Sequence, residues 1–420
     1  MFSFNEQEYK STLPVNYVLE EGESQKDFLV IVFSGFNEKG EKKYNYMKTL
    51  RNMDCHKLFI LDSYGPRGCY YIGENMSFEV ETSVTSLIFY TIRKLGVKPE
   101  NVICAGSSKG GSAALYFSLK YNLGYSVAGA PQIHIGNYIT KASLETADYL
   151  LGIDESRGDN LKKLNQLILE QINDVQYTDI FCLTSENDPQ YNMHMVPFLE
   201  RTNEHEWKVE TKIDNQIKSH GEIAQAFPDY LVKKLLYIMY KINLEEISIE
   251  EIEEHHWRFT LKLTERPPGV KTSIVFKSAA NKDVRKHFDK EYELDLNELA
   301  KKKPEIYNVY LVLSYEHREL LSYPIKEVLI GKGLVFDGST VGFENGEINF
   351  KVKVSDPSNL EFAFYIKRDN KVIEKLPYGK DNTLTYKVPT KGTYQISYFI
   401  KTASGERLAE KSDLITVDNL

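Results

Sequence analysis

The stretch Asn101-Val-Ile-Cys-Ala-Gly-Ser-Ser-Lys-Gly-Gly111 decides the fold of this chain. A short apolar run stops at Gly106, and a helix-like run with Ala113, Leu115 and Leu119 begins just beyond it. This pattern predicts a strand and a helix joined by a tight turn. The turn matches G-x-S-x-G, in which a serine sits on a sharp strand-to-helix bend with its hydroxyl exposed.

Two neighbouring serines occupy this turn, and a steric argument distinguishes them. The bend leaves almost no room for side chains two positions before and two positions after the serine at its apex. With Ser108 at the apex, those positions are Gly106 and Gly110, whereas Ser107 would place an alanine and a lysine there. We therefore predict that Ser108 carries the exposed hydroxyl.

Strand and helix patterns alternate along the chain up to about residue 244. Continuous apolar runs, typical of strands buried on both faces of a sheet, occupy residues 28–33, 57–61, 125–130 and 179–183. Between them lie helical patterns, the longest over residues 79–95. The predicted fold class is α/β, with a mostly parallel sheet covered by helices. The polar, mostly helical segment 133–175 is where a cap would be inserted.

Beyond residue 244 the pattern changes to short, often alternating strands separated by turn signals. This pattern predicts two small all-β modules of the sandwich type. The last module has about the size of one immunoglobulin-like unit. We therefore expect domains over residues 1–244, 245–331 and 332–420, with Gly331-Lys-Gly333 as a hinge between the two β modules.

Length, charge and cysteine usage exclude several classes of protein. The 420 residues are too many for a single core, and the net charge of -8 argues against a nucleic-acid-binding protein. No apolar run approaches the roughly 20 residues of a membrane span, and the first residues lack the pattern of a signal peptide. The four cysteines lack metal-ligand spacing, so we expect no metal site and a reduced, cytoplasmic protein.

An activated serine needs a base and a carboxylate that orients the base, and both have candidates. Asp188 follows the strand predicted at 179–183, and His220 lies in the turn before the last helix. Both side chains should therefore lie at the same sheet edge as Ser108, where open α/β sheets bind ligands. His134, His194 and His205 fit this chain order less well. Glu186 remains an alternative acid.

The backbone donors of an oxyanion hole can also be predicted around the serine. A developing oxyanion needs two backbone N–H donors, which we assign to Lys109 and to Phe36 or Gly35. The Lys109 side chain itself is expected to be solvated.

Residues 63–78 form a long loop in which turn formers alternate with aromatic residues, and such loops are often functional. Asp62, Tyr70 and Tyr71 are candidate substrate contacts, because a carboxylate and aromatic faces suit sugar hydroxyls and rings. Packing of the two tyrosines within the loop is the alternative interpretation.

These motifs resemble two related bacterial families: capsular polysaccharide biosynthesis proteins of the XcbB/CpsF type, and the accessory Sec-system O-acetyltransferase that modifies sugars on serine-rich adhesins. The similar stretches, within roughly residues 28–240, are Leu61-Asp-Ser-Tyr-Gly-Pro-Arg-Gly-Cys-Tyr-Tyr-Ile-Gly-Glu74, Ala105-Gly-Ser-Ser-Lys-Gly-Gly111, Ala128-Gly-Ala-Pro-Gln132 and Ser185-Glu-Asn-Asp-Pro-Gln-Tyr191. The resemblance implies an α/β-hydrolase-like fold with a catalytic triad at Ser108, His220 and Asp188. For the acetyltransferase family, the resemblance implies glutamate as the acid of the triad. An aspartate at this position would be a departure from that pattern, so the choice between Asp188 and Glu186 stays open.

The expected function is serine-dependent acyl transfer, by an O-acetyltransferase or O-acetylesterase acting on a cell-surface glycan. Both activities share the first chemical step, so the sequence does not separate them. An acyl donor such as acetyl-CoA is compatible with this chemistry, and the β modules are candidates for pairing two copies or binding a partner protein. The alternative is a non-catalytic glycan-binding or polysaccharide-assembly protein with a vestigial triad.

Overall fold

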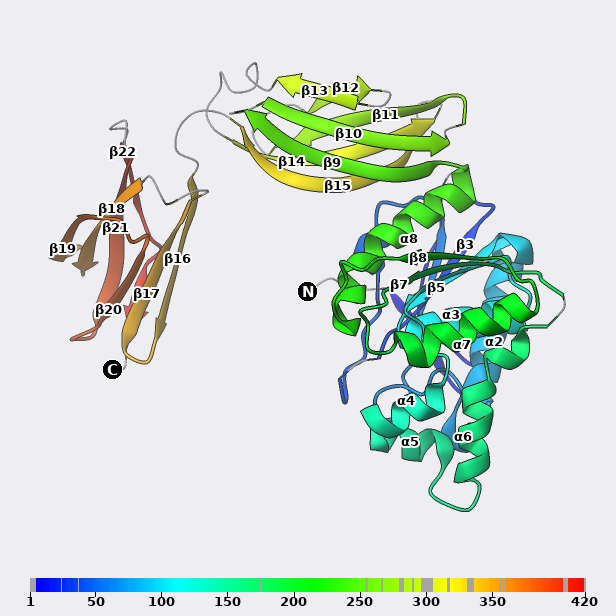
Figure 1. The fold of residues 1–420 in the computed structure, drawn as a ribbon. Coiled ribbons are helices and arrows are strands. Elements are labelled where there is room, and N and C mark those ends of the chain that lie inside the picture. Colours follow the sequence, from blue (N-terminus) through cyan, green and yellow to red (C-terminus); the bar gives the residue numbers. More distant parts are fainter. Residues whose placement is uncertain are drawn as a thin grey trace. The chain divides into compact units, whose positions relative to one another are not determined.

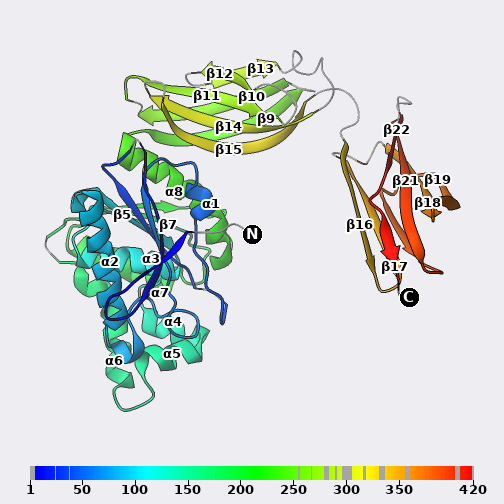
Figure 2. The same cartoon turned by 180° about the vertical axis from the view of Figure 1, so that it is seen from behind.

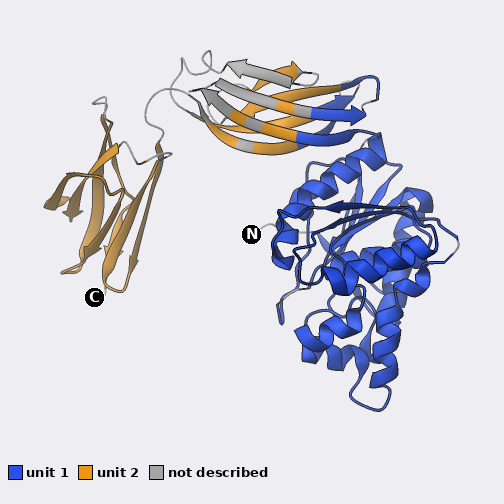
Figure 3. Cartoon of the chain, in the orientation of Figure 1, with its two compact units in different colours: residues 1–246, 262–270, 313–322 blue, residues 247–261, 271–312, 323–420 orange. Residues whose placement is uncertain are grey.

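The chain divides into two compact units in a computed structural model (Figure 3). Unit 1 comprises residues 1–246, 262–270 and 313–322, and unit 2 comprises residues 247–261, 271–312 and 323–420. The structure describes residues 5–23, 25–36, 38–173, 175–253, 256–265, 267–278, 283–288, 291–295, 305–315, 318–330, 336–354, 357, 360–402 and 407–418.

Unit 1 is built on an eight-stranded sheet with the strand order β1-β2-β4-β3-β5-β6-β7-β8. Figure 1 shows strands of this sheet, such as β5 and β7, among the helices of unit 1. The strands are β1 (Glu6–Tyr9), β2 (Val15–Glu20), β3 (Leu29–Phe33), β4 (His56–Ile60), β5 (Val102–Ser107), β6 (Tyr125–Gly129), β7 (Asp179–Thr184) and β8 (Val209–Ile213). Neighbours from β4 to β8 pair in parallel, whereas β1 and β2 add an antiparallel edge. Every residue of β3, β4 and β5 is buried, as expected for strands covered on both faces. The predicted α/β-hydrolase-like, mostly parallel sheet is confirmed.

Helices connect these strands as the alternating pattern predicted. They are α1 (Met47–Leu50), α2 (Glu79–Leu95), α3 (Lys109–Lys120), α4 (Ile135–Ala142), α5 (Leu144–Leu151), α6 (Arg157–Gln166), α7 (Tyr191–Glu204) and α8 (Ile223–Tyr240), with short 3-10 turns η1 (Glu74–Met76), η2 (Pro99–Asn101), η3 (Leu169–Gln171) and η4 (His220–Glu222). Helix α3 packs on β3, β5 and β6, and α8 packs on β5, β6 and β7. Helices α4, α5 and α6 gather beside η1 and form the segment expected to be a cap (Figure 1 and Figure 2).

The turn between β5 and α3 brings the backbone of three segments into close contact. Ser108 adopts φ 52° and ψ -122°, a conformation that L residues rarely occupy. A Cβ atom on Gly106 would lie 2.5 Å from the carbonyl carbon of Gly110, and one on Gly110 would lie 2.5 Å from the carbonyl oxygen of Phe33. Only glycine fits at these two positions, which agrees with the steric argument that placed Ser108 at the apex.

A buried ion pair fastens this turn to the loop that follows β4. The Lys109 Nζ atom lies 2.6 Å from Asp62 Oδ2, and neither side chain is exposed to solvent. The same carboxylate accepts a hydrogen bond of 2.8 Å from the Cys69 backbone N–H. The expectation that the Lys109 side chain is solvated was wrong, because the long loop folds over it and supplies its counter-charge.

Beyond α8 the chain forms several small antiparallel sheets, as predicted. Their strands are β9 (Asn243–Glu253), β10 (His256–Glu265), β11 (Val270–Lys277), β12 (Val284–Phe288), β13 (Glu291–Asp295), β14 (Glu305–Tyr315), β15 (Arg318–Ile330), β16 (Phe336–Glu344), β17 (Glu347–Val354), β18 (Leu360–Arg368), β19 (Lys371–Gly379), β20 (Thr383–Lys387), β21 (Gly392–Thr402), β22 (Arg407–Lys411) and β23 (Ile415–Val417). The immunoglobulin-like assignment and the boundaries at 244 and 331 stay predictions, and the Gly331–Gly333 hinge lies outside the described residues.

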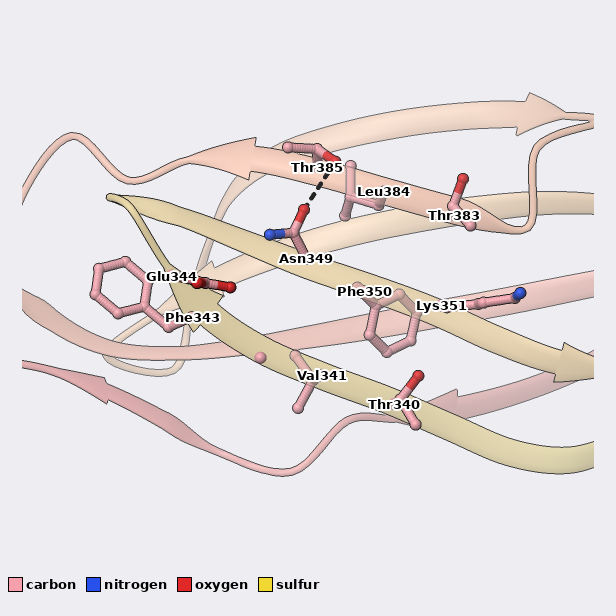
Figure 4. A pocket seen from close by; sticks show the side chains of 11 residues that line it. Thr340, Val341, Phe343, Glu344, Asn349, Phe350, Lys351, Thr383, Leu384 and Thr385 are labelled. Carbon is pink, nitrogen blue, oxygen red and sulfur yellow. Dashed lines mark hydrogen bonds between the residues drawn. The ribbon is translucent and has the colours of Figure 1, made fainter. Parts of the chain in front are cut away.

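The last part of unit 2 has its own core and a surface groove. Phe350 of β17 packs against Phe364 of β18 and Tyr398 of β21, with ring centroids 5.8 and 5.1 Å apart. The sheet β16-β17-β20 carries a groove of about 510 Å³, across which Thr385 Oγ1 donates a hydrogen bond of 3.0 Å to Asn349 Oδ1 (Figure 4). Within the described part of the chain, no helix is long and apolar enough to cross a bilayer.

We expect Gly106→Ala to lower the free energy of unfolding by about 2 kcal/mol or more, because the added methyl group forces β5 away from α3. Urea unfolding followed by circular dichroism measures this loss. Gly158→Ala in α6 is the matched control, because no atom beyond the adjoining residues and backbone of its own helix lies within 4 Å of its Cβ position, and alanine is the better helix former. Equal stability of the two variants would contradict the close-packing argument.

We expect Lys109→Met to lower the free energy of unfolding by about 3 to 5 kcal/mol, because it leaves the Asp62 carboxylate buried without a counter-charge. Adding Asp62→Asn to this variant should restore part of the loss in the same urea titration. Lys98→Met, which removes an exposed lysine 3.9 Å from Glu100, should leave stability unchanged within error. A Lys109→Met protein as stable as wild type would show that the buried pair does not hold the turn.

Candidate active site

Three side chains that are far apart in the sequence meet at one edge of the sheet. Ser108 follows β5, Asp188 follows β7, and His220 begins η4 after β8. His220 Nε2 lies 2.8 Å from Ser108 Oγ, and His220 Nδ1 lies 2.7 Å from Asp188 Oδ2. These are the three residues that the sequence analysis predicted. They lie within hydrogen-bonding distance of one another, with His220 between Ser108 and Asp188. Their catalytic role stays a prediction.

Asp188 is a buried carboxylate, and both of its oxygen atoms have hydrogen-bond partners. Only 3% of the residue is exposed, and its Oδ1 atom accepts a hydrogen bond of 2.9 Å from the Gln190 backbone N–H. This leaves Oδ2 for His220. The alternative acid, Glu186, is exposed, and its Oε2 atom accepts a hydrogen bond from Asn215. The geometry therefore pairs Asp188, and not Glu186, with the imidazole.

The hydrogen bonds of His220 define which ring nitrogen carries the proton. An ionised carboxylate can only accept a hydrogen bond, so Nδ1 must donate to Asp188. The other nitrogen, Nε2, is then free to accept the hydrogen of the Ser108 hydroxyl in the neutral ring. The His220 side chain is 21% exposed, and Ser108 is half-buried, so a ligand can reach the pair. This arrangement allows the imidazole to take a proton from the serine.

A second histidine lies near this group but is held differently. His194 of α7 is buried, and its Nδ1 atom accepts hydrogen bonds of 3.2 Å from the backbone N–H groups of Ile133 and His134. Burial, helped by the positive charges that His134 and His220 can carry, lowers the pKa of His194 to about 4. His194 is therefore neutral at physiological pH and bonds to backbone in the core, which distinguishes it from His220.

The neighbouring Ser107 makes a separate contact that no pattern in the sequence indicated. Its Oγ atom lies 2.5 Å from the hydroxyl of Tyr46, whose ring packs against Phe227 of α8 with centroids 5.1 Å apart. Burial raises the pKa of Tyr46, so the hydroxyl stays protonated at neutral pH. Ser107 and Ser108 therefore have different partners, and only Ser108 contacts His220.

The candidates for an oxyanion hole can be narrowed from the contacts after β3. The Gly35 backbone N–H donates to Asn45 Oδ1 at 2.8 Å, so this group is already engaged. Phe36 is half-buried, with the guanidinium carbon of Arg67 4.3 Å from its ring centroid. The backbone N–H of Lys109 belongs to the first residue of α3, directly after the serine. Lys109 and Phe36 stay the predicted donors.

The predicted substrate contacts at Asp62, Tyr70 and Tyr71 are contradicted by their burial, with exposed fractions of 3%, 2% and 0%. Asp62 pairs with Lys109, and Tyr71 donates to the Ile60 carbonyl oxygen at 2.8 Å. Burial raises the pKa of both tyrosines well above its usual value, so both hydroxyls remain donors. The alternative interpretation, packing of the loop, is the one that the structure shows.

Tyr70 begins a chain of hydrogen bonds that ends at the carboxylate beside His220. Its hydroxyl donates to Gln132 Oε1 at 2.5 Å, and Gln132 Nε2 donates to Gln190 Oε1 at 3.3 Å. The Gln190 backbone N–H then donates to Asp188. Sequence reasoning noted the stretch that ends at Gln132 but assigned it no role, because its partners come from two other segments of the chain.

Comparison with known proteins gives one family match in unit 1. Residues 17–196 match the sequence model of the family described as Accessory Sec system GspB-transporter. A segment of 109 residues is 33% identical to an accessory Sec system protein of Staphylococcus aureus. This segment makes up 26% of the present chain and spans only 20% of the length of that relative.

Two solved structures give weaker likenesses. A capsule O-acetyltransferase of Neisseria meningitidis serogroup A, in complex with CoA, has a TM-score of 0.49 and 23% identity over 55% of this chain and 94% of its own. A Glycosylation Associate Protein complex from Streptococcus agalactiae has a TM-score of 0.44 and 18% identity over 55% of this chain and 46% of that chain. The resemblance to the accessory Sec family that the sequence motifs predicted is thus confirmed by the family match over residues 17–196.

Proposed function

We propose that this chain is an acyl-transfer enzyme in which Ser108 is the nucleophile, His220 the general base and then acid, and Asp188 the residue that orients His220. The observation that supports this proposal is the continuous set of contacts from Asp188 Oδ2 through both nitrogens of His220 to Ser108 Oγ, at 2.7 and 2.8 Å. An ordinary surface histidine has no reason to bond a buried carboxylate on one side and a serine on the other.

The reaction that these residues support has two steps. Ser108 attacks the acyl carbonyl carbon as its proton passes to His220 Nε2, and the backbone N–H groups of Lys109 and Phe36 hold the oxyanion. His220 then gives the proton to the leaving group, which leaves an acyl ester on Ser108. A hydroxyl group of the acceptor attacks this ester with His220 as base, and the serine is regenerated. Water as acceptor makes the enzyme an esterase, and a sugar hydroxyl makes it a transferase.

We propose that the acceptor is a hydroxyl of a cell-surface or secreted glycan and that the transferred group is an acetyl group. The support is the family match together with the motifs that resemble the accessory Sec-system O-acetyltransferase. Acetyl-CoA is the proposed donor. A cytoplasmic location and pairing through the C-terminal β sheets, with a second copy or with a partner protein of the same glycan pathway, belong to the same proposal.

Removing the nucleophile should abolish the reaction. We expect Ser108→Ala to lower kcat for p-nitrophenyl acetate hydrolysis by at least about a thousandfold and to abolish labelling by a fluorophosphonate probe. Ser107→Ala is the matched control and should keep activity within a few-fold of wild type, because Ser107 bonds Tyr46 instead of His220. Equal rates for wild type and Ser108→Ala, with no labelling of either, would favour a glycan-binding protein with a vestigial triad.

The two candidate acids can be separated by isosteric substitution. We expect Asp188→Asn to lower kcat on the order of a thousandfold or more, because the amide favours the wrong tautomer of His220. Glu186→Gln should leave kcat unchanged, since Glu186 is exposed and bonded to Asn215. The same p-nitrophenyl acetate assay measures both, and the opposite ranking of the two variants would assign the acid to Glu186.

A further inference from the structure

Tyr138 lies in α4, the first helix of the segment inserted between β6 and β7, and its ring connects two aromatic side chains from other parts of unit 1. The ring centroid of Tyr138 lies 6.0 Å from that of Phe36 and 6.0 Å from that of His194, edge-on in both cases. Phe36 follows β3, whereas His194 lies in the first turn of α7, after β7. We call these three rings, Phe36, Tyr138 and His194, the aromatic row.

The strand order places the aromatic row across the end of the strand that leads to Ser108. Strands β5 and β6 lie between β3 and β7 in the sheet, and Ser108 directly follows β5. Neighbouring strands are about 4.8 Å apart, so β3 and β7 are separated by roughly 14 Å. Two ring-to-ring steps of 6.0 Å bridge most of this gap. The row therefore crosses the sheet edge at which Ser108 lies.

The helix that carries Tyr138 belongs to the layer beyond this edge. Helix α4 begins at Ile135, six residues after the end of β6 at Gly129, and packs on α5 and α6. Figure 2 shows these three helices together, beyond the ends of the strands. Tyr138 is half-buried, so its ring covers part of the candidate site and is still in contact with solvent.

Both ends of the aromatic row lie beside groups of the candidate site. At one end, the backbone N–H of Phe36 is a predicted oxyanion donor. At the other end, burial and the charges that His134 and His220 can carry lower the pKa of His194 to about 4, so the rings of His194 and His220 are near each other. The Tyr138 ring lies between these two ends, next to the predicted position of the acyl group.

The neighbours of Phe36 and His194 hold the row in place. The guanidinium carbon of Arg67 lies 4.3 Å from the Phe36 ring centroid, and the ring of the buried Tyr70 lies 6.3 Å from it. His194 Nδ1 accepts hydrogen bonds of 3.2 Å from two backbone N–H groups. A ligand that pushes Tyr138 aside must disturb these packed contacts, which costs free energy.

We propose that Tyr138 is the specificity-determining residue for the length of the acyl group that Ser108 accepts. The inference rests on the proposed function. During attack by Ser108, the carbonyl oxygen points to the N–H groups of Lys109 and Phe36, and the leaving group points to His220, which must protonate it. The alkyl part of the acyl group takes the remaining direction, away from the serine oxygen.

The packing around the serine leaves the aromatic row as the boundary of that direction. Beside Ser107, the space is filled by the ring of Tyr46, which packs against Phe227 with centroids 5.1 Å apart. The alkyl chain therefore meets the Tyr138 ring. A short acyl group fits beneath this ring, whereas a longer unbranched chain has to displace it. Pockets that discriminate by apolar size alone do so by about 10- to 200-fold.

The experiment compares two esters that share the leaving group and differ in the acyl chain, p-nitrophenyl acetate and p-nitrophenyl hexanoate. We expect kcat/KM of the wild type to be at least about tenfold higher for the acetate, and Tyr138→Ala to lower this acetate-to-hexanoate ratio by about tenfold or more. Tyr138→Phe keeps the ring and should keep the wild-type ratio. A ratio does not depend on the fraction of folded enzyme, so a loss of stability cannot imitate the result.

Tyr149→Ala is the matched control, because Tyr149 is a half-buried tyrosine of α5 in the same inserted segment that packs beside Gly65. This variant should show the wild-type ratio. Equal rates for both esters in the wild type, or an unchanged ratio in Tyr138→Ala, would overturn the inference. A fall of the same size in Tyr149→Ala would also overturn it, because the effect would then come from general loosening of the segment.

Assaying Ser108→Ala with the same two esters separates this inference from the proposed function. Hydrolysis that needs Ser108 but has the same acetate-to-hexanoate ratio in Tyr138→Ala and wild type would leave the proposed function standing and remove the role of Tyr138. Hydrolysis of neither ester, or hydrolysis that is independent of Ser108, would instead overturn the proposed function, and this inference with it.

Discussion

The close approach of β5 and α3 at Ser108 is the constraint on which the rest of the site depends. The serine has a backbone conformation that is rarely populated, and it is held there because Gly106 and Gly110 let three backbone segments touch. This contact raises the Ser108 hydroxyl out of the sheet while every residue of β5 stays buried. The strained turn would relax in isolation, so the surrounding layers must supply the free energy that maintains it.

Much of that support comes from the loop after β4. The sequence predicted that the tyrosines of this loop and the Asp62 carboxylate contact a sugar. All three side chains are instead buried, and Asp62 contacts Lys109 of the turn. Asp62 neutralises Lys109, and Tyr70 reaches the carboxylate of Asp188 through Gln132 and Gln190. A buried charge without its partner is strongly destabilising, so the loop and the turn can only be ordered together. Polar groups that resemble binding residues in a sequence can thus serve to hold neighbouring segments of the fold together.

The candidate site can be reached from solvent, whereas the carboxylates that support it are buried. Ser108 is half-buried and the His220 side chain is 21% exposed, but Asp188 and Asp62 are each only 3% exposed. A ligand can therefore reach the hydroxyl and the imidazole without displacing the carboxylates behind them.

The sequence by itself determined the α/β sheet, the turn at Ser108 and the order of serine, acid and histidine, because apolar runs and the glycine spacing encode local structure directly. It did not reveal β1, whose residues are polar and lie at the sheet edge, or the partners of Lys109 and Tyr46. Nor could it tell whether Asp188 or Glu186, two residues apart in one turn, contacts His220. Only the tertiary structure decided these points, because burial and hydrogen-bond partners depend on segments that lie tens of residues away and meet only when the layers pack.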